Sequence, residues 1–167
     1  MPIENERKYV LPADLDAGRL DGWKRYDIRQ AYLDDGPRIR QKNDEYFFTY
    51  KRWIPEVSEL VEIETGISHD DFSLLWSHRV QALEKTRFEN RDGDVEWVVD
   101  FLHDSSGGIY FVLAEVELPR GQAQPDHVPD EIAGSILYAV AADDNRFTNK
   151  KLSDQDYARR LFEKVAD

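Results

Sequence analysis

The sequence predicts a single α+β domain over residues 1–167, built on an eight-stranded antiparallel β-barrel with surrounding helices. Eight short runs rich in β-branched and aromatic residues lie before about residue 118, and turn-forming residues separate several of them. Capped segments with helical periodicity interrupt and follow these runs. Strands at this spacing are typical of a barrel or a sandwich. Charged residues repeated along single strand faces favour the barrel.

The expected strands are separated by turn signals such as the stretches 34–37 and 91–94, which carry Asp and Gly. No repeat, low-complexity tract or linker divides the chain. The strands are expected at Ile3–Leu11, Asp27–Leu33, Pro37–Lys42, Tyr46–Arg52, Leu60–Gly66, Leu83–Asn90, Val95–His103 and Tyr110–Leu118.

Helices are expected where a capping residue precedes a periodic stretch. Ser68 is a helix-capping residue type, and the amphipathic stretch Phe72–Leu83 follows it. The stretch Pro129–Val140 is expected to be helical, because proline suits a first helical turn. Ser153 repeats the capping pattern before a last helix. A short helix is also expected over Ala13–Leu20.

The composition excludes several classes of function. Cysteine is absent, which excludes disulfides, thiolate catalysis and cysteine-ligated metals. The formal net charge of −12 argues against a nucleic-acid surface, because phosphate backbones attract basic residues. No apolar run approaches the ~18 residues of a membrane span and no signal peptide is recognisable, so a cytoplasmic protein without a membrane partner is expected. The acidic excess is compatible with solubility alone or with carboxylates that hold divalent cations.

Like charges recur at positions i and i+2 of the expected strands, which places them on one face of each strand. A half-exposed sheet with solvated charges would explain any single pair. It explains the set less well, because acids and bases are sorted onto separate strands. A barrel with a charged lumen accounts for the set, provided that a ligand or ion neutralises it. The pairs are Glu4 and Glu6 with Lys8, Arg38 and Arg40, Glu62 and Glu64, Lys85 and Arg87, and Glu115 and Glu117, with single charges at Lys51 and Asp100.

A triphosphate is a ligand that needs both signs of charge. Arg and Lys bind its oxygens, and Arg offers a bidentate fork. Carboxylates bind the Mg²⁺ or Mn²⁺ that accompanies the anion. The cation can polarise a phosphoryl oxygen and orient or activate a water molecule. The pattern therefore favours metal-dependent phosphoryl transfer from a small-molecule triphosphate to water.

The residues Glu4–Lys8 match the E-x-E-x-K signature of the CYTH superfamily, the triphosphate tunnel metalloenzymes. Later elements occur in the order of the family, and the resemblance spans about residues 3–152. The corresponding segments are Gln30–Leu33 for Q-x-Y-L, Arg38–Arg40 for R-x-R, Thr49–Lys51 for T-x-K, Glu62–Glu64, Lys85–Arg87, Asp100, Glu115–Glu117, and Arg146–Asn149 for R-Y-x-N.

The resemblance implies an eight-stranded antiparallel tunnel with helices around it. Family members hydrolyse tripolyphosphate, thiamine triphosphate or RNA 5′-triphosphate ends, or cyclise ATP. Lys8 and Tyr32 resemble a dyad that activates water in short bacterial members, so both are implied to be catalytic. The implied polyphosphate ligands are Lys8, Arg38, Arg40, Lys51, Lys85 and Arg87. The implied metal side consists of Glu4, Glu6, Glu62, Glu64, Asp100, Glu115 and Glu117.

One segment departs from the family pattern. A Glu-Val-Thr run is expected before the C-terminal motif, but Val140 stands in place of the acid, unless Asp143 or Asp144 replaces it. The leading function is hydrolysis of inorganic tripolyphosphate. Hydrolysis of a nucleoside or thiamine triphosphate, class IV-type adenylyl cyclisation and non-catalytic sensing of polyphosphate or nucleotide stay open, as does a homodimer. The retained glutamate pairs speak against the sensor, because anion binding alone does not need them.

Overall fold

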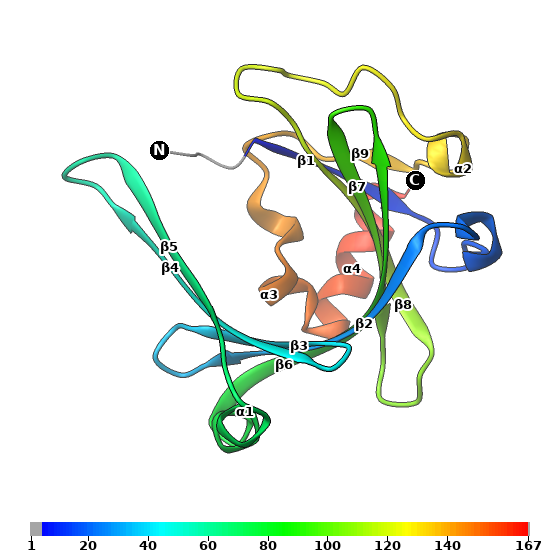
Figure 1. Cartoon of the computed structure of the whole chain (residues 1–167). Coiled ribbons are helices and arrows are strands. Elements are labelled where there is room, and N and C mark those ends of the chain that lie inside the picture. Colours follow the sequence, from blue (N-terminus) through cyan, green and yellow to red (C-terminus); the bar gives the residue numbers. More distant parts are fainter. Residues whose placement is uncertain (1–4, 167) are drawn as a thin grey trace.

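The chain folds around one strongly curved antiparallel sheet of nine strands (Figure 1). The computed structural model describes residues 5–166, so the expected metal ligand Glu4 lies outside the described residues. The strands are β1 Glu6–Leu11, β2 Lys24–Leu33, β3 Arg38–Lys42, β4 Glu45–Ile54, β5 Glu59–Gly66, β6 Arg79–Asp92, β7 Val95–His103, β8 Ile109–Glu117 and β9 Tyr138–Ala139.

The hydrogen-bonded order of the strands is β5-β4-β3-β2-β6-β7-β8-β1-β9. Within residues 5–166 the two end strands, β5 and β9, do not pair with each other, so hydrogen bonds do not close the sheet. The expected α+β class and antiparallel sheet are confirmed. The strand pairing of these residues does not show the expected closed eight-stranded barrel: the sheet has nine strands, and the β4–β5 hairpin extends away from β1 and β9 (Figure 1).

The first helix, α1 His69–Trp76, begins where its cap predicts. Ser68 accepts a hydrogen bond from the backbone N–H of Asp71 at 3.0 Å, which satisfies one of the free N–H groups of the first turn. The helix is shorter than the expected Phe72–Leu83, because the chain returns to the sheet at Arg79 and starts β6 there.

The remaining helices are short except the last. They are the 3₁₀ turn η1 Ala17–Leu20, α2 Asp130–Ala133, the 3₁₀ turn η2 Asn145–Phe147, α3 Asn149–Leu152 and α4 Gln155–Val165. The expected helix Pro129–Val140 is wrong beyond Ala133, because Tyr138–Ala139 pairs with β1 as a strand. The last helix is capped by Asp154 and not by Ser153. No helix in the described part of the chain is long and apolar enough to cross a bilayer.

The outer, convex face of the sheet is apolar and covered on β1, β7 and β8 and under α1, whereas Arg25 and Arg29 on β2 line an open hollow on the same face. Alternate side chains of β1, β7 and β8 pack there against η1, α2 and the chain before them, and Trp97 is fully buried in that cluster. A second cluster lies under α1, where Phe72 packs on Ile39 and Leu33. Burial of these faces fixes which residues turn inward, because a shift of one residue would exchange the two faces.

The inner, concave face is divided into an apolar half and a charged half. Phe147, Leu152 and the buried face of α4 pack on the inward residues of β1, β7 and β8. Figure 1 shows α3 and α4 inside the curve of the sheet. These segments cover one half of the concave face and leave the charged half next to them.

Phe147 connects the C-terminal segment to the sheet. Its ring is fully buried and contacts the rings of Phe111 and Tyr138. We predict that Phe147→Ala lowers the free energy of unfolding by about 3–5 kcal/mol, measured by urea denaturation, because it leaves a cavity between α3 and the sheet. Leu74→Ala, at a position that is 69% exposed on α1, is the control and should change stability little. Equal losses in the two variants would contradict this packing.

Candidate functional site

The concave face carries the charges that the sequence pattern places on single strand faces. Alternation along each strand turns one set of side chains inward, and strand pairing brings the sets together. Arg87 is thus the cross-strand partner of Asp100, and Lys8 that of Glu115. From β5 to β1 the inward charged residues include Glu62 with Glu64, Lys51, Arg38 with Arg40 and Lys42, Lys85 with Arg87 and Glu89, Asp100, Glu115 with Glu117, and Glu6 with Lys8.

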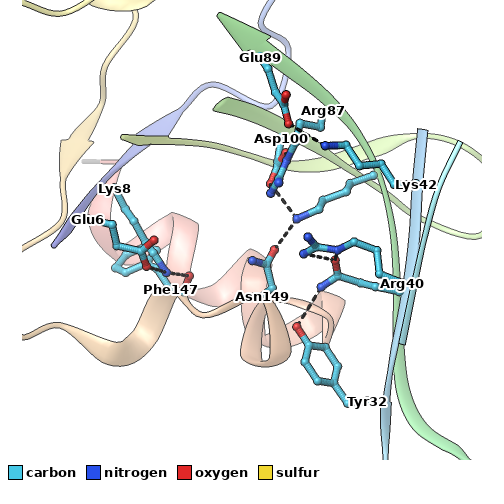
Figure 2. A network of polar contacts seen from close by, with 12 residues as sticks. Glu6, Lys8, Tyr32, Arg40, Lys42, Arg87, Glu89, Asp100, Phe147 and Asn149 are labelled. Carbon is cyan, nitrogen blue, oxygen red and sulfur yellow. Dashed lines mark hydrogen bonds and ion pairs between the residues drawn. The ribbon is translucent and has the colours of Figure 1, made fainter. Parts of the chain in front are cut away.

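Asp100 is the centre of a buried ion cluster (Figure 2). Its Oδ2 accepts from Lys85 Nζ at 2.8 Å and from Arg87 Nη2 at 2.9 Å, and its Oδ1 accepts from Arg87 Nε at 2.8 Å. Burial alone would raise the pKa of Asp100, but the charges of Lys85 and Arg87 outweigh it and hold that pKa well below its usual range. Asp100 is therefore an ionised carboxylate that holds two cations in place.

These contacts change the roles that the resemblance implies. Both oxygens of Asp100 are occupied by cations, so its geometry is that of an ion-pair partner and not of a free metal ligand. The side chain of Lys85 is 0% exposed, and its Nζ also donates to Asn149 Oδ1 at 3.1 Å. Burial lowers the pKa of Lys85, and Asp100 opposes that shift. Lys85 is thus placed to orient Asp100 and Asn149 rather than to reach a bound anion.

The guanidinium groups of Arg38 and Arg40 on β3 have only neutral partners. Arg40 donates from Nε and Nη2 to Gln30 Oε1 at 3.1 and 2.9 Å, and Arg38 Nη2 lies 3.5 Å from Thr49 Oγ1. Neither forms an ion pair with a carboxylate of residues 5–166. Burial, and next the charge of Arg38, lower the pKa of Arg40 to about 9, which leaves it protonated at neutral pH. Two adjacent cations without a carboxylate in direct contact are typical of a site for an anion.

Carboxylates gather at the other side of the face, on β1 and β8. Glu6 and Glu117 are cross-strand partners, and Glu6 forms an ion pair with Lys8 at 3.4 Å. Lys8 Nζ also donates to the backbone oxygen of Phe147 at 3.3 Å. Glu115 Oε1 is buried without a hydrogen-bond partner among the described residues. Burial, and next the charge of Glu6, raise the pKa of Glu115.

The fit of this acidic end to a divalent cation rests on Glu115. An unpartnered carboxylate oxygen beside Glu6 has the chemistry of a hard-cation ligand, since Mg²⁺ and Mn²⁺ take oxygen donors. Among residues 5–166, however, no three Asp, Glu, His or Cys side chains lie close enough to hold a metal together. Glu4, two residues before Glu6, lies outside the described residues. The described residues alone therefore do not form a complete metal site, and the role of Glu6, Glu115 and Glu117 as ligands stays a prediction.

The remaining implied metal residues lie on the far edge of the sheet. Glu62 on β5 pairs with Lys51 at 3.8 Å, and Glu64 accepts from Thr49 at 3.1 Å. Strands β4, β3, β2, β6 and β7 separate them from the carboxylates of β8 and β1 in the sheet. The structure therefore does not bring all the predicted metal residues together.

Among the described residues, the predicted catalytic pair is not joined by a hydrogen bond either. Lys8 lies on β1 and Tyr32 on β2, and β6, β7 and β8 stand between these strands. Lys8 contacts Glu6 and Phe147, whereas Tyr32 Oη lies 2.9 Å from Gln30 Nε2. No hydrogen bond joins Lys8 to Tyr32 in the described part of the chain.

Gln30 and Asn149 are site residues that the charge pattern does not identify. Gln30 is fully buried and Asn149 receives a hydrogen bond from Lys85. Both lie inside the motifs of the resemblance, which assigns them no role. The signal for Gln30 is its position, because it alternates with Tyr32 on the inward face of β2 between two charged strands.

The departure at Val140 lies beside the acidic end of the site. Val140 packs in the apolar half of the concave face, and its backbone N–H donates to Lys8 O at 2.9 Å. The carboxylate of Asp144 is already engaged by Arg146, whose Nη2 donates to Oδ2 at 2.8 Å, so it is not a free substitute for the missing acid. Asp143 is exposed on the rim of a hollow of about 200 Å³ that also borders Glu6 and Lys8. Val140 borders the same hollow, although its own side chain is largely buried.

Comparison with solved structures shows that this fold is shared with a protein from Bacillus halodurans. That protein is described as a "putative adenylate cyclase", and its chain has 20% sequence identity to this one with a TM-score of 0.50. The match covers 72% of this chain and 82% of the other. No protein-family model matches the sequence, and no curated protein matches it. The likeness supports the fold, and the assignment of a function rests on the site.

The Asp100 cluster makes a testable contribution to stability. Asp100→Asn leaves Lys85 buried without its counter-charge, so we predict a loss of about 3–5 kcal/mol in the free energy of unfolding at pH 7. Because the folded pKa of Asp100 is depressed, the contribution exists above the unfolded pKa near ~3.9 and is lost as the pH falls below it. The difference between wild type and variant should therefore shrink below about pH 4.

Urea denaturation at several pH values measures this difference. Asp44→Asn, at an exposed position in the β3–β4 turn, is the matched control and should follow the wild type. A pH-independent difference for Asp100→Asn would show that the carboxylate charge is not the source of the stability.

Proposed function

We propose that this protein is a divalent-metal-dependent triphosphatase of the CYTH type, with inorganic tripolyphosphate as its preferred substrate. The observation that carries the proposal is the pair Arg38 and Arg40, two cations on one strand with neutral partners only. A polyanion supplies the counter-charge that these residues lack. The matching motifs from Glu4–Lys8 to Arg146–Asn149 and the shared fold support the CYTH assignment.

The chain's own residues account for binding and orientation. Arg38 and Arg40 bind phosphoryl oxygens, and Arg87, whose side chain is 13% exposed, adds charge at the edge of the Asp100 cluster. Lys8 adds a cation at the acidic end. Water attacks the terminal phosphorus, the bridging P–O bond breaks, and the proton of the water is released with phosphate and pyrophosphate as products. Positioning and charge stabilisation supply most of the acceleration in such reactions.

Glu6, Glu115 and Glu117 are the described residues that would hold a divalent cation, together with Glu4. When bound, such a cation neutralises phosphoryl charge and lowers the pKa of coordinated water. The acidic end and the Arg38–Arg40 pair lie at different places on the concave face. This arrangement suits an elongated anion that contacts the two arginines at one end and a bound divalent cation at the other.

A second candidate function is cyclisation of ATP. The name of the Bacillus halodurans structure favours it, although 20% identity limits that support to the fold. The two reactions are distinguished by products, since a cyclase releases pyrophosphate and a cyclic nucleotide and a triphosphatase releases orthophosphate. Hydrolysis of a nucleoside or thiamine triphosphate and sensing without turnover are further alternatives.

A substrate panel tests the proposed function. Tripolyphosphate, ATP and thiamine triphosphate are each incubated with Mg²⁺ or Mn²⁺, and orthophosphate, pyrophosphate and cyclic nucleotide are measured. We expect orthophosphate release to be fastest from tripolyphosphate and to stop with a chelator. Cyclic nucleotide from ATP would establish the cyclase instead. Binding of tripolyphosphate without turnover under any of these conditions would establish a sensor.

Arg40→Ala tests the cationic end. We predict a rise in KM of tenfold or more, because a charge-assisted contact to phosphate contributes about 1.5–3 kcal/mol. Arg160→Ala, at an exposed position on α4, is the control for loss of a positive charge elsewhere. Steady-state phosphate release measures both. An unchanged KM and kcat in Arg40→Ala would remove Arg40 from the binding site.

Glu115→Gln tests the acidic end by separating stability from activity. Because the folded pKa of Glu115 is raised, its carboxylate destabilises the folded state above the unfolded pKa near ~4.3. We predict that the variant is more stable than wild type at pH 7 in the presence of a chelator, and that metal-dependent turnover is lost. Thermal unfolding and phosphate release measure the two effects. A variant that is less stable and fully active would contradict the assignment.

A further inference from the structure

Gln30 connects the cationic end of the site to Tyr32. Its side chain is 0% exposed, and both ends of its amide are used. Oε1 lies 3.1 Å from Arg40 Nε and 2.9 Å from Arg40 Nη2, and Nε2 lies 2.9 Å from Tyr32 Oη. Figure 2 shows Arg40 and Tyr32 on the same side of the sheet with these contacts between them.

The direction of these hydrogen bonds follows from Arg40. A guanidinium only donates, so the amide group that faces it must be the carbonyl oxygen of Gln30. The NH₂ group of Gln30 then faces Tyr32 and donates to Oη. Tyr32 therefore accepts this bond with a lone pair and keeps its own O–H proton for another partner.

Within residues 5–166, Tyr32 Oη has no hydrogen bond in which it is the donor. The charges facing the phenol are Arg38 and Arg40 on β3, and Lys150 of α3 lies 6.0 Å from the ring centroid. Each of these groups is a cation without acceptor capacity. Burial raises the pKa of Tyr32, against the charge of Arg38 and the hydrogen bond from Gln30, so the phenol is neutral at pH 7.

We propose that Tyr32 donates its O–H to a phosphoryl oxygen of the bound anion, and that Gln30 is the positioning residue that sets this direction. The inference rests on the proposed binding of a triphosphate to the concave face. It assigns Tyr32 to binding of the substrate, and not to the removal of a proton from water that the resemblance implies. Hydrogen bonds run from Arg40 to Gln30 and from Gln30 to Tyr32. The acceptor for the Tyr32 proton is then an anionic oxygen of the substrate, held next to Arg38.

Binding without metal separates these two roles. Tripolyphosphate is titrated calorimetrically into the protein in the presence of a chelator, and kcat and KM are measured with Mg²⁺. Tyr32→Phe should weaken metal-free binding about tenfold or more and raise KM, because it removes a hydrogen bond to a charged group. Tyr26→Phe is the control, because Tyr26 lies on the same face of β2 but outside the hydrogen bonds that join Arg40, Gln30 and Tyr32. This variant should bind tripolyphosphate like wild type. A Tyr32→Phe variant with unchanged binding and KM but reduced kcat would overturn the inference in favour of a base.

Gln30→Glu tests the positioning role. The carboxylate keeps the contacts with Arg40 but accepts from Tyr32, so the proton of Tyr32 is no longer free for the anion. Tyr32→Phe should then weaken metal-free binding less than about twofold in the Gln30→Glu background, although each single change weakens it strongly. Additive losses would show that Gln30 does not set the direction of Tyr32.

The outcome also separates this inference from the proposed function. Wild-type protein that neither binds nor hydrolyses tripolyphosphate overturns the proposed function, and the inference with it. Wild-type protein that binds and hydrolyses it, with a Tyr32→Phe variant of unaltered affinity, overturns the inference alone. Because Tyr32→Phe removes one oxygen and retains the ring, the test does not depend on whether Gln30→Glu folds.

Discussion

The structure depends on the sorting of charge across a curved sheet whose outer face is packed. On β1, β7 and β8, and on the parts of β2 and β3 under α1, apolar residues bury the convex face, so the charged residues that alternate with them lie on the concave face. Curvature brings these charges toward one another, and each must then be compensated or solvated. Asp100 compensates Lys85 and Arg87 within the protein. Arg38 and Arg40 have no such carboxylate among residues 5–166, and that difference directs an anion to β3.

The C-terminal segment determines how much of the concave face is available. Phe147, Leu152 and α4 cover its apolar half. The same segment supplies polar groups to the charged half, since Asn149 accepts from Lys85 and the backbone oxygen of Phe147 accepts from Lys8. Packing of this segment therefore positions cations from two distant strands. Stability of the apolar half and geometry of the charged half are physically coupled.

Much of this arrangement follows from sequence periodicity, and the rest needs tertiary information. The strands, the inward charge pairs and the cap at Ser68 are local patterns, so they could be predicted. Closure of the sheet could not, because it depends on where the β4–β5 hairpin points (Figure 1). The exclusive pairing of Asp100 with cations depends on cross-strand register, which a list of charged residues does not contain. Gln30 is uncharged, so the charge pattern does not identify it, although its burial between two strands with cations makes it decisive for hydrogen-bond direction.

The most direct measurement is a crystal structure of the protein soaked with tripolyphosphate and Mg²⁺. Compensation of the β3 cations predicts phosphoryl oxygens within hydrogen-bond distance of Arg38 and Arg40 on the concave face. An anion bound instead in the hollow of the outer face that Arg25 and Arg29 line, with Arg38 and Arg40 left as they are, would contradict the account.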